Sequence, residues 1–214
     1  MIGITNSLFS KQFLPRLHTS VPVEADDASL PALRSDDDLN GGLDNAAADD
    51  TRAAAVLMGL VERDGEVHVL LTQRSDSLPT HPGQIAFPGG KIDPDDAGPV
   101  ACALRETHEE TGVAPEFVDP VGFLDVYQTR TGFRVVPVVA LLKPGYALVP
   151  EPGEVTEIFD VPLAHFMDPA NHLRHSREYG GKLRYFHAMP YGERYVWGAT
   201  AGILKNLHDR VYGP

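Results

Sequence analysis

The stretch ALRETHEETGV, from Ala103 to Val113, restricts the possible structures of this chain more than any other part of it. At about 100° per residue, a helix through it places Glu106, Glu109 and Glu110 within an arc of roughly 100°. The neighbouring arc holds uncharged, mostly apolar residues, namely Val100, Ala103, Leu104 and Thr107. One face of such a helix can pack against a sheet while the adjacent face presents three carboxylates.

The residues on either side indicate where this helix begins and ends. Asp95 and Asp96 belong to the residue types that cap the amino terminus of a helix. Pro99 is tolerated in a first turn, and Gly112 is placed to terminate the helix. We therefore predict a helix that begins near Asp95 and Asp96, with their side chains as its cap, and ends at Gly112.

The three carboxylates carry an electrostatic cost. Glu106 and Glu110 are like charges four residues apart, which destabilises an isolated helix by about 0.2–0.5 kcal/mol. A solvated acidic face is the common explanation for such a group taken alone. A hard divalent cation such as Mg²⁺ would compensate for the repulsion and would bridge the carboxylates to a substrate phosphate. Arg105, beside Glu109 on the helix surface, is placed to orient a carboxylate.

Length and charge limit the function classes. The 214 residues suffice for one well-cored domain, and the net charge of −12 gives no electrostatic basis for binding nucleic acid or an anionic membrane. The sequence shows neither a secretory leader nor an apolar run near the roughly 18 residues of a membrane span. With Cys102 as its single cysteine, we expect a cytoplasmic protein without disulfides. Its oligomeric state is open, with a homodimer as one option.

The amino-terminal part differs in composition from the rest. Residues 24–50 carry nine acidic residues and one basic residue and contain no aromatic residue. Such a segment has too few apolar groups to offset the entropy of ordering it. We therefore expect residues 1–51 to comprise a helix-like segment and an acidic flexible linker, followed by a domain over residues 52–214.

The domain shows alternating strand and helix patterns. Strands are predicted over residues 53–61 and 67–74, joined by a tight turn at Asp64-Gly65, and over residues 121–130, 133–142 and 157–163. Residues 200–212 have the apolar spacing of a second helix. Several strands and two helices predict an α/β or α+β layered fold.

The helix motif resembles the box of the Nudix hydrolases, commonly written G-x5-E-x7-R-E-U-x-E-E-x-G-U, in which U is apolar. RETHEETGV matches its right half, with Thr107 in place of an apolar residue. The left half departs, because Asp96 stands where the box has Glu and the interval before Arg105 is one residue longer. The position leaves the role of Asp96 open.

The resemblance implies a fold, a reaction and a site. The fold would be a mixed sheet between helices, and the reaction would be metal-dependent hydrolysis of a nucleoside diphosphate linked to another moiety. Mg²⁺ or Mn²⁺ would be bound by Glu106, Glu109, Glu110 and the backbone carbonyl of Gly90. Gly89 and Gly90 would form the loop that approaches the metal site and contacts the substrate, since glycine places no side chain in the way of the cation or the diphosphate.

The segment LLTQRSDSLPTHPGQIAFPGG, Leu70 to Gly90, is similar to the pattern of coenzyme A pyrophosphatases, L-L-T-x-R-[SA]-x3-R-x3-G-x3-F-P-G-G. Pro79 departs from the second Arg of that pattern. The similarity implies hydrolysis of coenzyme A or its derivatives to 4′-phosphopantetheine, or its acyl form, and adenosine 3′,5′-bisphosphate. Thr72, Arg74 and His81 have suitable chemistry to contact the 3′-phosphate, although Arg74 could equally form a surface salt bridge.

Other roles stay open on the sequence. Arg105, Glu106, Glu109 and Glu154 form the expected catalytic set. Glu106 and Glu154 are alternatives for the general base, and Glu157 is a third. The substrate could instead be another nucleoside diphosphate derivative, such as ADP-ribose or a dinucleotide, and the chain could also be a nucleotide sensor without activity. The complete Arg-Glu-x-x-Glu-Glu set argues against the sensor.

Overall fold

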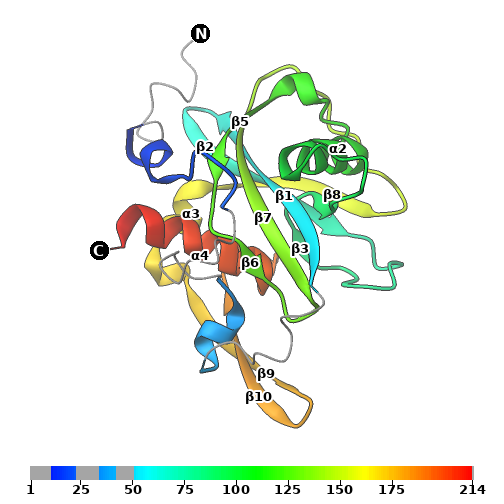
Figure 1. The fold of residues 1–214 in the computed structure, drawn as a ribbon. Helices are drawn as coiled ribbons and strands as arrows, with labels where there is room; N and C mark the ends of the chain where they lie inside the picture. Colours follow the sequence, from blue (N-terminus) through cyan, green and yellow to red (C-terminus); the bar gives the residue numbers. More distant parts are fainter. Residues whose placement is uncertain (1–10, 23–33, 42–50, 214) are drawn as a thin grey trace.

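A mixed sheet between helices forms the body of the molecule, as the sequence predicted (Figure 1). The computed structural model describes residues 11–22, 34–41 and 51–213. Its eight-stranded sheet has the order β3-β2-β1-β7-β5, with β4 pairing β1, β6 pairing β7 and β8 pairing β2. The strands are β1 (Arg52–Arg63), β2 (Glu66–Arg74), β3 (Ile85–Ala86), β4 (Gly89–Lys91), β5 (Val118–Phe123), β6 (Tyr127–Gln128), β7 (Phe133–Leu142) and β8 (Val155–Pro162). The parallel β1–β7 pair makes this otherwise antiparallel sheet mixed.

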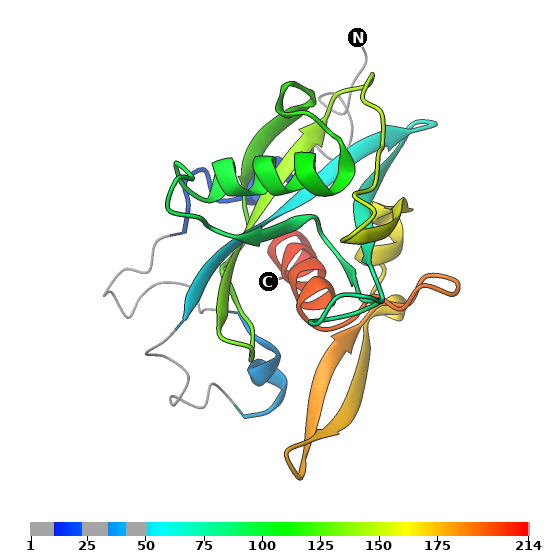
Figure 2. The same cartoon turned by 90° about the vertical axis from the view of Figure 1, so that its right-hand side faces the viewer.

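Two apolar layers cover the two faces of the sheet. Helix α2 (Pro99–Thr111) packs on one face, where Cys102 and Ala103 are buried with Leu57 and Leu70. Helices α3 (Leu163–Met167) and α4 (Ala199–Tyr212) cover the other face (Figure 2). The odd and even residues of β2 divide between these layers, as the alternation of a strand requires. Thr72 and Arg74 therefore face α2, whereas Gln73 faces the opposite side.

Most predicted elements are present. The β1–β2 hairpin turns at Asp64 and Gly65, which both have positive φ, 51° and 85°. The prediction of one continuous strand over residues 121–130 is wrong. The chain forms β5, then an irregular stretch from Leu124, and then β6. A register shift in the β5–β7 pairing between Pro120 and Gly122 marks where the regular ladder is disturbed.

Strands β1 and β2 separate from each other along their length. This separation determines where the Leu70–Gly90 segment meets the acidic motif of α2. The two strands pair only from Leu60 to Arg63 of β1. Nearer the start of β1, Ala54 to Val56 pair with β4 instead. Nearer the end of β2, Thr72 and Gln73 pair with β3. The segment from β3 to β4 thus fills the gap between the separating strands. This arrangement brings both ends of the Leu70–Gly90 segment to one edge of the gap, next to α2.

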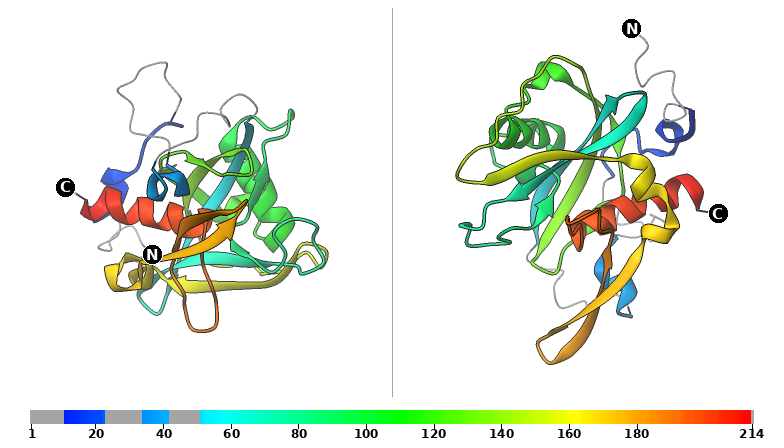
Figure 3. Two further views of the ribbon diagram at one scale, coloured as in Figure 1. Left: turned by 90° about the horizontal axis from the view of Figure 1, so that it is seen from below. Right: turned by 180° about the vertical axis from the view of Figure 1, so that it is seen from behind.

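A second sheet stands away from the body. The two-stranded hairpin of β9 (Leu173–Tyr179) and β10 (Lys182–Ala188) projects beyond the main sheet (Figures 1 and 3). The sequence analysis did not predict it. Short 3-10 turns, η2 (Leu14–Arg16), η3 (Asp36–Leu39), η5 (Pro115–Phe117) and η6 (Pro169–Asn171), complete the described structure. Within the described ranges, no helix is long and apolar enough to cross a membrane.

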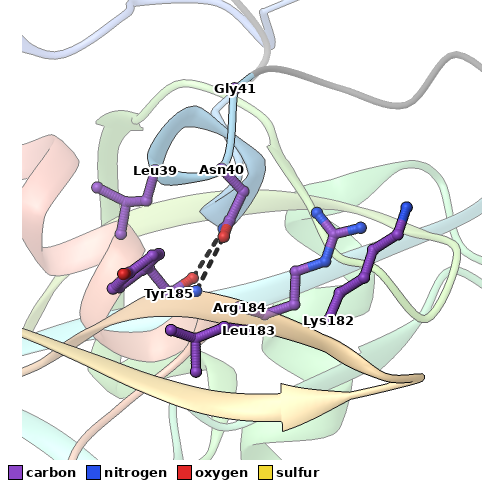
Figure 4. Close-up of a pocket in the computed structure, with 7 residues that line it drawn as sticks. All are labelled: Leu39, Asn40, Gly41, Lys182, Leu183, Arg184 and Tyr185. Atoms are coloured by element: carbon purple, nitrogen blue, oxygen red, sulfur yellow. Dashed lines mark hydrogen bonds between the residues drawn. The ribbon is translucent and has the colours of Figure 1, made fainter.

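Part of the acidic segment is ordered against the domain. Asp37 of η3 is buried and forms an ion pair with Arg130 at 2.6 Å. The Asn40 amide makes two hydrogen bonds with the backbone of Tyr185 on β10, both 2.9 Å, at the edge of a groove of about 530 Å³ (Figure 4). The expected solvated linker is therefore wrong for residues 34–41, because charge pairing anchors a segment with few apolar groups. Residues 24–33 and 42–50 lie outside the described residues, and the division at residue 51 stays a prediction.

Residues nearer the amino terminus also contribute to the core. Phe13 and Leu17 are buried against the α4 side of the sheet. The backbone of His18 bridges Phe123 at the end of β5. The expected helix-like segment lies partly over residues 1–10, which are outside the described ranges.

Candidate active site

Helix α2 carries its carboxylates on the side that faces the β3–β4 segment, where β1 and β2 separate. Glu110 is buried, with 4% of its surface exposed, whereas the Glu109 side chain is 56% exposed. The helix ends at Gly112, whose φ of 75° is left-handed, as predicted. Its predicted start is wrong: the helix begins at Pro99, and its N-cap Gly98 makes no side-chain cap.

Asp96 pairs with Arg105 instead of capping the helix. The guanidinium donates through Nε to Asp96 Oδ1 at 3.1 Å and through Nη2 to Oδ2 at 2.9 Å, a bidentate ion pair. The Asp96 side chain is only 6% exposed. Hydrogen bonds from Arg105 lower the pKa of Asp96 to about 2. The acid of the left half of the motif is therefore an anchor for Arg105.

Arg105 also orients two of the predicted metal ligands. Its Nη1 donates to Glu106 Oε1 and to Glu109 Oε2, both at 3.0 Å. Asp96, Arg105, Glu106 and Glu109 thus form a connected network of charges. The structure thus shows the pairing that was expected of Arg105, and its part in catalysis stays a prediction. A single guanidinium thus holds two of the three carboxylates, Glu106, Glu109 and Glu110, that form what we call the acidic edge of α2.

Thr107 occupies the apolar position of the motif without an unpaired hydroxyl. The residue is fully buried, and its Oγ1 donates to the carbonyl of Ala103 at 2.6 Å. This bond to the preceding turn satisfies the only polar group that the substitution introduces. The departure at Thr107 therefore leaves the carboxylate face in place.

The two glycines of β4 approach the acidic edge closely. The Gly89 N–H donates to Glu110 Oε2 at 3.3 Å. A Cβ on Gly90 would lie 2.3 Å from Glu106 Oε1, so only glycine permits this approach. Both predicted loop residues thus meet the carboxylates of α2.

A loop after β7 is tied to the end of α2 and carries Glu154. The N–H groups of Val149 and Glu151 donate to the carbonyls of Thr111 and Glu110 at 2.8 and 3.2 Å. The Glu154 carbonyl accepts from Ser75 N–H, just beyond β2, at 2.7 Å. The charge of Glu154 contributes to raising the pKa of Glu110. The predicted carboxylate from beyond the motif is therefore held beside the acidic edge.

Comparisons with known proteins agree with this geometry. A family model described as the NUDIX domain matches residues 50–179, more than half of the chain. Nudix hydrolase 15, mitochondrial, of Arabidopsis thaliana is 40% identical over 168 residues, which cover 75% of this chain and 59% of that protein. The chain belongs to the Nudix hydrolase family. The uncharacterized Nudix hydrolase NudL of Enterobacter sp. (strain 638) is 38% identical over 161 residues, covering 73% of this chain and 81% of that one.

Solved structures of the family are more distant. The NUDIX domain of Shewanella oneidensis NrtR, complexed with ADP ribose, is 24% identical, with a TM-score of 0.45 over 59% of this chain and 82% of that chain. A MutT/nudix family protein from Enterococcus faecalis is 21% identical, with a TM-score of 0.49 over 75% of this chain and 62% of that chain.

The acidic edge of this Nudix domain is short of positive charge. Burial raises the pKa of Glu110 to about 8, with repulsion from Glu106 adding to it and attraction from Arg74 opposing it. Burial likewise raises the pKa of Glu106, against the hydrogen bond from Arg105. Carboxylate oxygens such as those of Glu106 and Glu110 are the donors that a hard divalent cation prefers, and the backbone of Gly90 lies against the Glu106 carboxylate. The donor set thus fits the metal ions that Nudix hydrolases generally need.

The third carboxylate is turned away in the described conformation. Among the described residues, no three acidic, histidine or cysteine side chains are gathered as a metal site. Glu109 is held by Arg105, on the exposed side of the helix. Its predicted role as a ligand stays a prediction, which requires its side chain to turn from Arg105 towards Glu110.

The three residues predicted to contact the 3′-phosphate have different surroundings in the structure. Thr72 does not fit this role, since it is 1% exposed and its hydroxyl donates to the Ala86 carbonyl at 3.3 Å. Arg74 faces the α2 side, where its charge opposes the burial that raises the pKa of Glu110. The Arg74 Nε is buried and has no hydrogen-bond partner among the described residues. His81 is exposed, with a left-handed φ of 55°, and its role stays a prediction.

Two other groups are poorly suited to a part in the reaction, although the Cys102 Sγ lies 3.6 Å from the Gly90 carbonyl. Glu157 pairs with Arg194 and is thereby a poor general base. Burial raises the pKa of the Cys102 thiol to about 11, and its Sγ contacts the Lys91 carbonyl at 3.2 Å. The thiol is therefore structural. Sequence reasoning missed the Asp96–Arg105 pair, although the place of Asp96 in the motif was a usable signal.

Proposed function

We propose that this Nudix hydrolase cleaves the diphosphate of coenzyme A or its derivatives, yielding 4′-phosphopantetheine, or its acyl form, and adenosine 3′,5′-bisphosphate. The observation that carries the proposal is the position of the Leu70–Gly90 segment. Its first part places Arg74 near Glu110, and its last part places Gly89 and Gly90 against the same carboxylates. The segment that resembles the coenzyme A pyrophosphatases therefore lines the acidic edge that resembles the general Nudix motif.

The chain supplies groups for binding, orientation and proton transfer. Glu106, Glu109, Glu110 and the Gly90 carbonyl would hold Mg²⁺ or Mn²⁺, and the bound ion would supply positive charge for the diphosphate and would lower the pKa of a water molecule. Arg105 orients Glu106 and Glu109.

Two further groups of the chain act on the reactants. The Arg74 guanidinium, with its buried Nε unpaired, would donate to a diphosphate oxygen. Glu154 is our choice for the proton acceptor, because it is exposed and its backbone is fixed to Ser75. Glu106, paired with Arg105, is the alternative.

A second substrate class is supported by one feature of the sequence. Pro79 stands where the coenzyme A pattern has an arginine. Another nucleoside diphosphate derivative is thus the runner-up. A sensor without activity is disfavoured by the intact Asp96–Arg105–Glu106 network, which has no necessary role in binding alone.

Product identification tests the proposal. The full chain is incubated with Mg²⁺ or Mn²⁺ and, separately, coenzyme A, an acyl-coenzyme A, dephospho-coenzyme A, ADP-ribose and a diadenosine polyphosphate, and products are identified by mass. Preferred cleavage of coenzyme A or its acyl form at the diphosphate, lost in Glu110→Gln, is the expected result. Preferred cleavage of ADP-ribose or the dinucleotide would overturn the substrate assignment, and no cleavage of any would support the sensor. The cytoplasmic location and a homodimer also remain proposals.

A further inference from the structure

A second cleft lies beyond the acidic edge, on the other side of β2. It encloses about 640 Å³ between residues 82–85 and residues 193–197, the segment that leads into α4. We name it the arginine–aromatic cleft, after Arg177, Arg194, Tyr195 and Trp197 in its lining. None of these residues has a part in the chemistry described above.

Aromatic rings form a continuous wall beside this cleft. Tyr195 stacks on His175 with 5.8 Å between ring centroids and an interplanar angle of 20°. On its other side it stacks on Trp197 at 6.3 Å and 29°. The Tyr195 hydroxyl lies 2.6 Å from His175 Nδ1, which fixes the ring, and Tyr195 is still 40% exposed. A fixed, partly exposed aromatic face is suited to stacking with a planar base.

The two arginines of the cleft are in different states. Arg194 pairs with Glu157 and lies 4.2 Å over the Phe159 ring, so it is already engaged. Arg177 of β9 is exposed, and with the described residues its guanidinium forms no ion pair or hydrogen bond. An arginine with five unengaged donors next to an aromatic wall provides a contact for a phosphate monoester.

The cleft is one nucleoside unit away from the acidic edge. Gln73, which lines the cleft, is adjacent to Arg74 and pairs with Glu157 across β2 and β8. Glu157 follows Glu154 by three residues, a separation of at most about 10 Å, because the chain turns at Glu154 and the β2–β8 pairing is irregular at Val155. A diphosphate at the carboxylates of α2 therefore places an attached nucleoside within reach of the cleft.

We propose that the arginine–aromatic cleft binds the 3′-phosphorylated adenosine end of the substrate, with the base on Tyr195 and Trp197 and the 3′-phosphate on Arg177. The inference rests on the proposed function and deepens it. It moves the 3′-phosphate contact from Arg74, which faces α2, to the opposite side of the strand. The pantetheine arm is excluded from the cleft because it has no ring to stack and no second phosphate.

The single tryptophan makes the cleft observable without catalysis. Trp197 is the only tryptophan of the chain, so a ligand stacked on the wall quenches its fluorescence. The full chain is titrated, without added metal, with adenosine 3′,5′-bisphosphate, adenosine 5′-monophosphate and 4′-phosphopantetheine. We expect saturable quenching by both adenosine compounds, with the bisphosphate binding about ten- to a hundredfold more tightly, as for one charge-assisted contact.

Variants decide whether Arg177 is the phosphate contact. Arg177→Ala should bring the bisphosphate to the affinity of the monophosphate. The matched control is Arg174→Ala on the same strand, because Arg174 stacks on Tyr185 and donates to the Leu39 carbonyl; it should retain the preference. The assignment is overturned by absent quenching, by a preference for 4′-phosphopantetheine, or by an Arg177→Ala variant that keeps the preference.

The experiments distinguish a failure of the cleft assignment from a failure of the proposed function. If coenzyme A is cleaved but the bisphosphate does not bind at Trp197, the cleft assignment fails while the proposed function stands. If the bisphosphate binds with the expected preference but coenzyme A is not cleaved, the hydrolytic function fails while the cleft remains a nucleotide site.

Discussion

Arg105 and Asp96 form a bidentate ion pair, with Nε and Nη2 of the arginine 3.1 and 2.9 Å from the two carboxylate oxygens. The same guanidinium holds Glu106 and Glu109. A carboxylate outside the proposed metal-ligand set is thereby connected, through Arg105, to two that belong to it. The shorter acid reaches Arg105 from a loop one residue longer than the Nudix pattern.

The first prediction concerns this pair. Asp96→Asn should reduce kcat about tenfold, because one charge-assisted fork is replaced by a weaker neutral contact. Asp96→Glu should recover part of the loss, since it restores the charge. The adjacent, exposed Asp95→Asn is the control and should retain wild-type kcat. Steady-state kinetics with a thermal midpoint for each variant provide the measurement, and a wild-type kcat in Asp96→Asn would refute the positioning role.

Local pattern predicted much of this molecule, and tertiary contacts set the limits of that prediction. The helix face and Gly112 were predictable because periodicity and a left-handed end are local properties. Asp96 was mistaken for a cap because a cap and a partner of Arg105 use the same residue type. The direction of Thr72, towards its Ala86 partner, depended on the β2–β3 pairing.

Charge partners distant in sequence account for the other corrections. The acidic stretch before β1 has the composition of a linker, yet Asp37 meets Arg130 and Asn40 meets Tyr185. Those partners follow by 93 and 145 residues. Composition contains no information about such pairings. The β9–β10 hairpin was missed for a related reason: β9 is largely exposed and β10 is mostly half-buried, so neither strand has the buried apolar face that reveals a strand in a sequence.

The second prediction concerns the acidic helix. Glu109→Gln and Glu110→Gln should each lower kcat by about a hundredfold or more at saturating Mg²⁺, since each removes a charged oxygen ligand at almost constant shape. Glu116→Gln, an exposed acid outside the site, is the control. Turnover is measured together with the thermal midpoint. Near-wild-type turnover in both helix variants would reject the metal-site assignment.

The two glycines of β4 should respond differently to alanine. In Gly90→Ala, the new Cβ meets only the end of the Glu106 side chain, at 2.3 Å, so we expect activity to fall at least tenfold with a thermal midpoint within a few degrees of wild type. In Gly89→Ala, the Cβ meets the Ala55 carbonyl at 2.4 Å and the Val56 Cα at 2.6 Å, which destabilises the fold. Thermal unfolding and kinetics of both variants are compared. Equal destabilisation would contradict the assignment of Gly90 to the site.

Arg74 is predicted to act on the diphosphate. Arg74→Ala should reduce kcat/KM for coenzyme A and dephospho-coenzyme A by similar factors, about ten- to a hundredfold, because both contain the diphosphate. Lys at this position should recover only part of the loss, since it lacks the guanidinium fork. The measurement is kcat/KM on both substrates. A loss confined to coenzyme A would instead return the 3′-phosphate contact to Arg74.

Asp125 anchors the amino-terminal segment to the end of α4. This buried carboxylate accepts from Arg210 Nη1 at 2.7 Å and from Asn206 Nδ2 at 2.6 Å, and lies 2.7 Å from His18 Nε2. Burial alone would raise its pKa, but the hydrogen bonds from His18 and Asn206 and the charge of Arg210 outweigh it, so the pKa of Asp125 is lowered.

The last prediction follows from that direction. A carboxylate with a lowered pKa in the folded state stabilises the protein fully above its unfolded value of about 3.9, and this contribution is lost as the pH falls through the folded pKa. Asp125→Asn should therefore lower the free energy of unfolding at neutral pH by about 3 kcal/mol, and flatten the loss of stability below about pH 4. Denaturant unfolding from pH 7 downwards measures both effects, and exposed Asp119→Asn on β5 is the control. If Asp125→Asn and wild type lost stability in parallel over the acid range, the cluster would not be the source of that dependence.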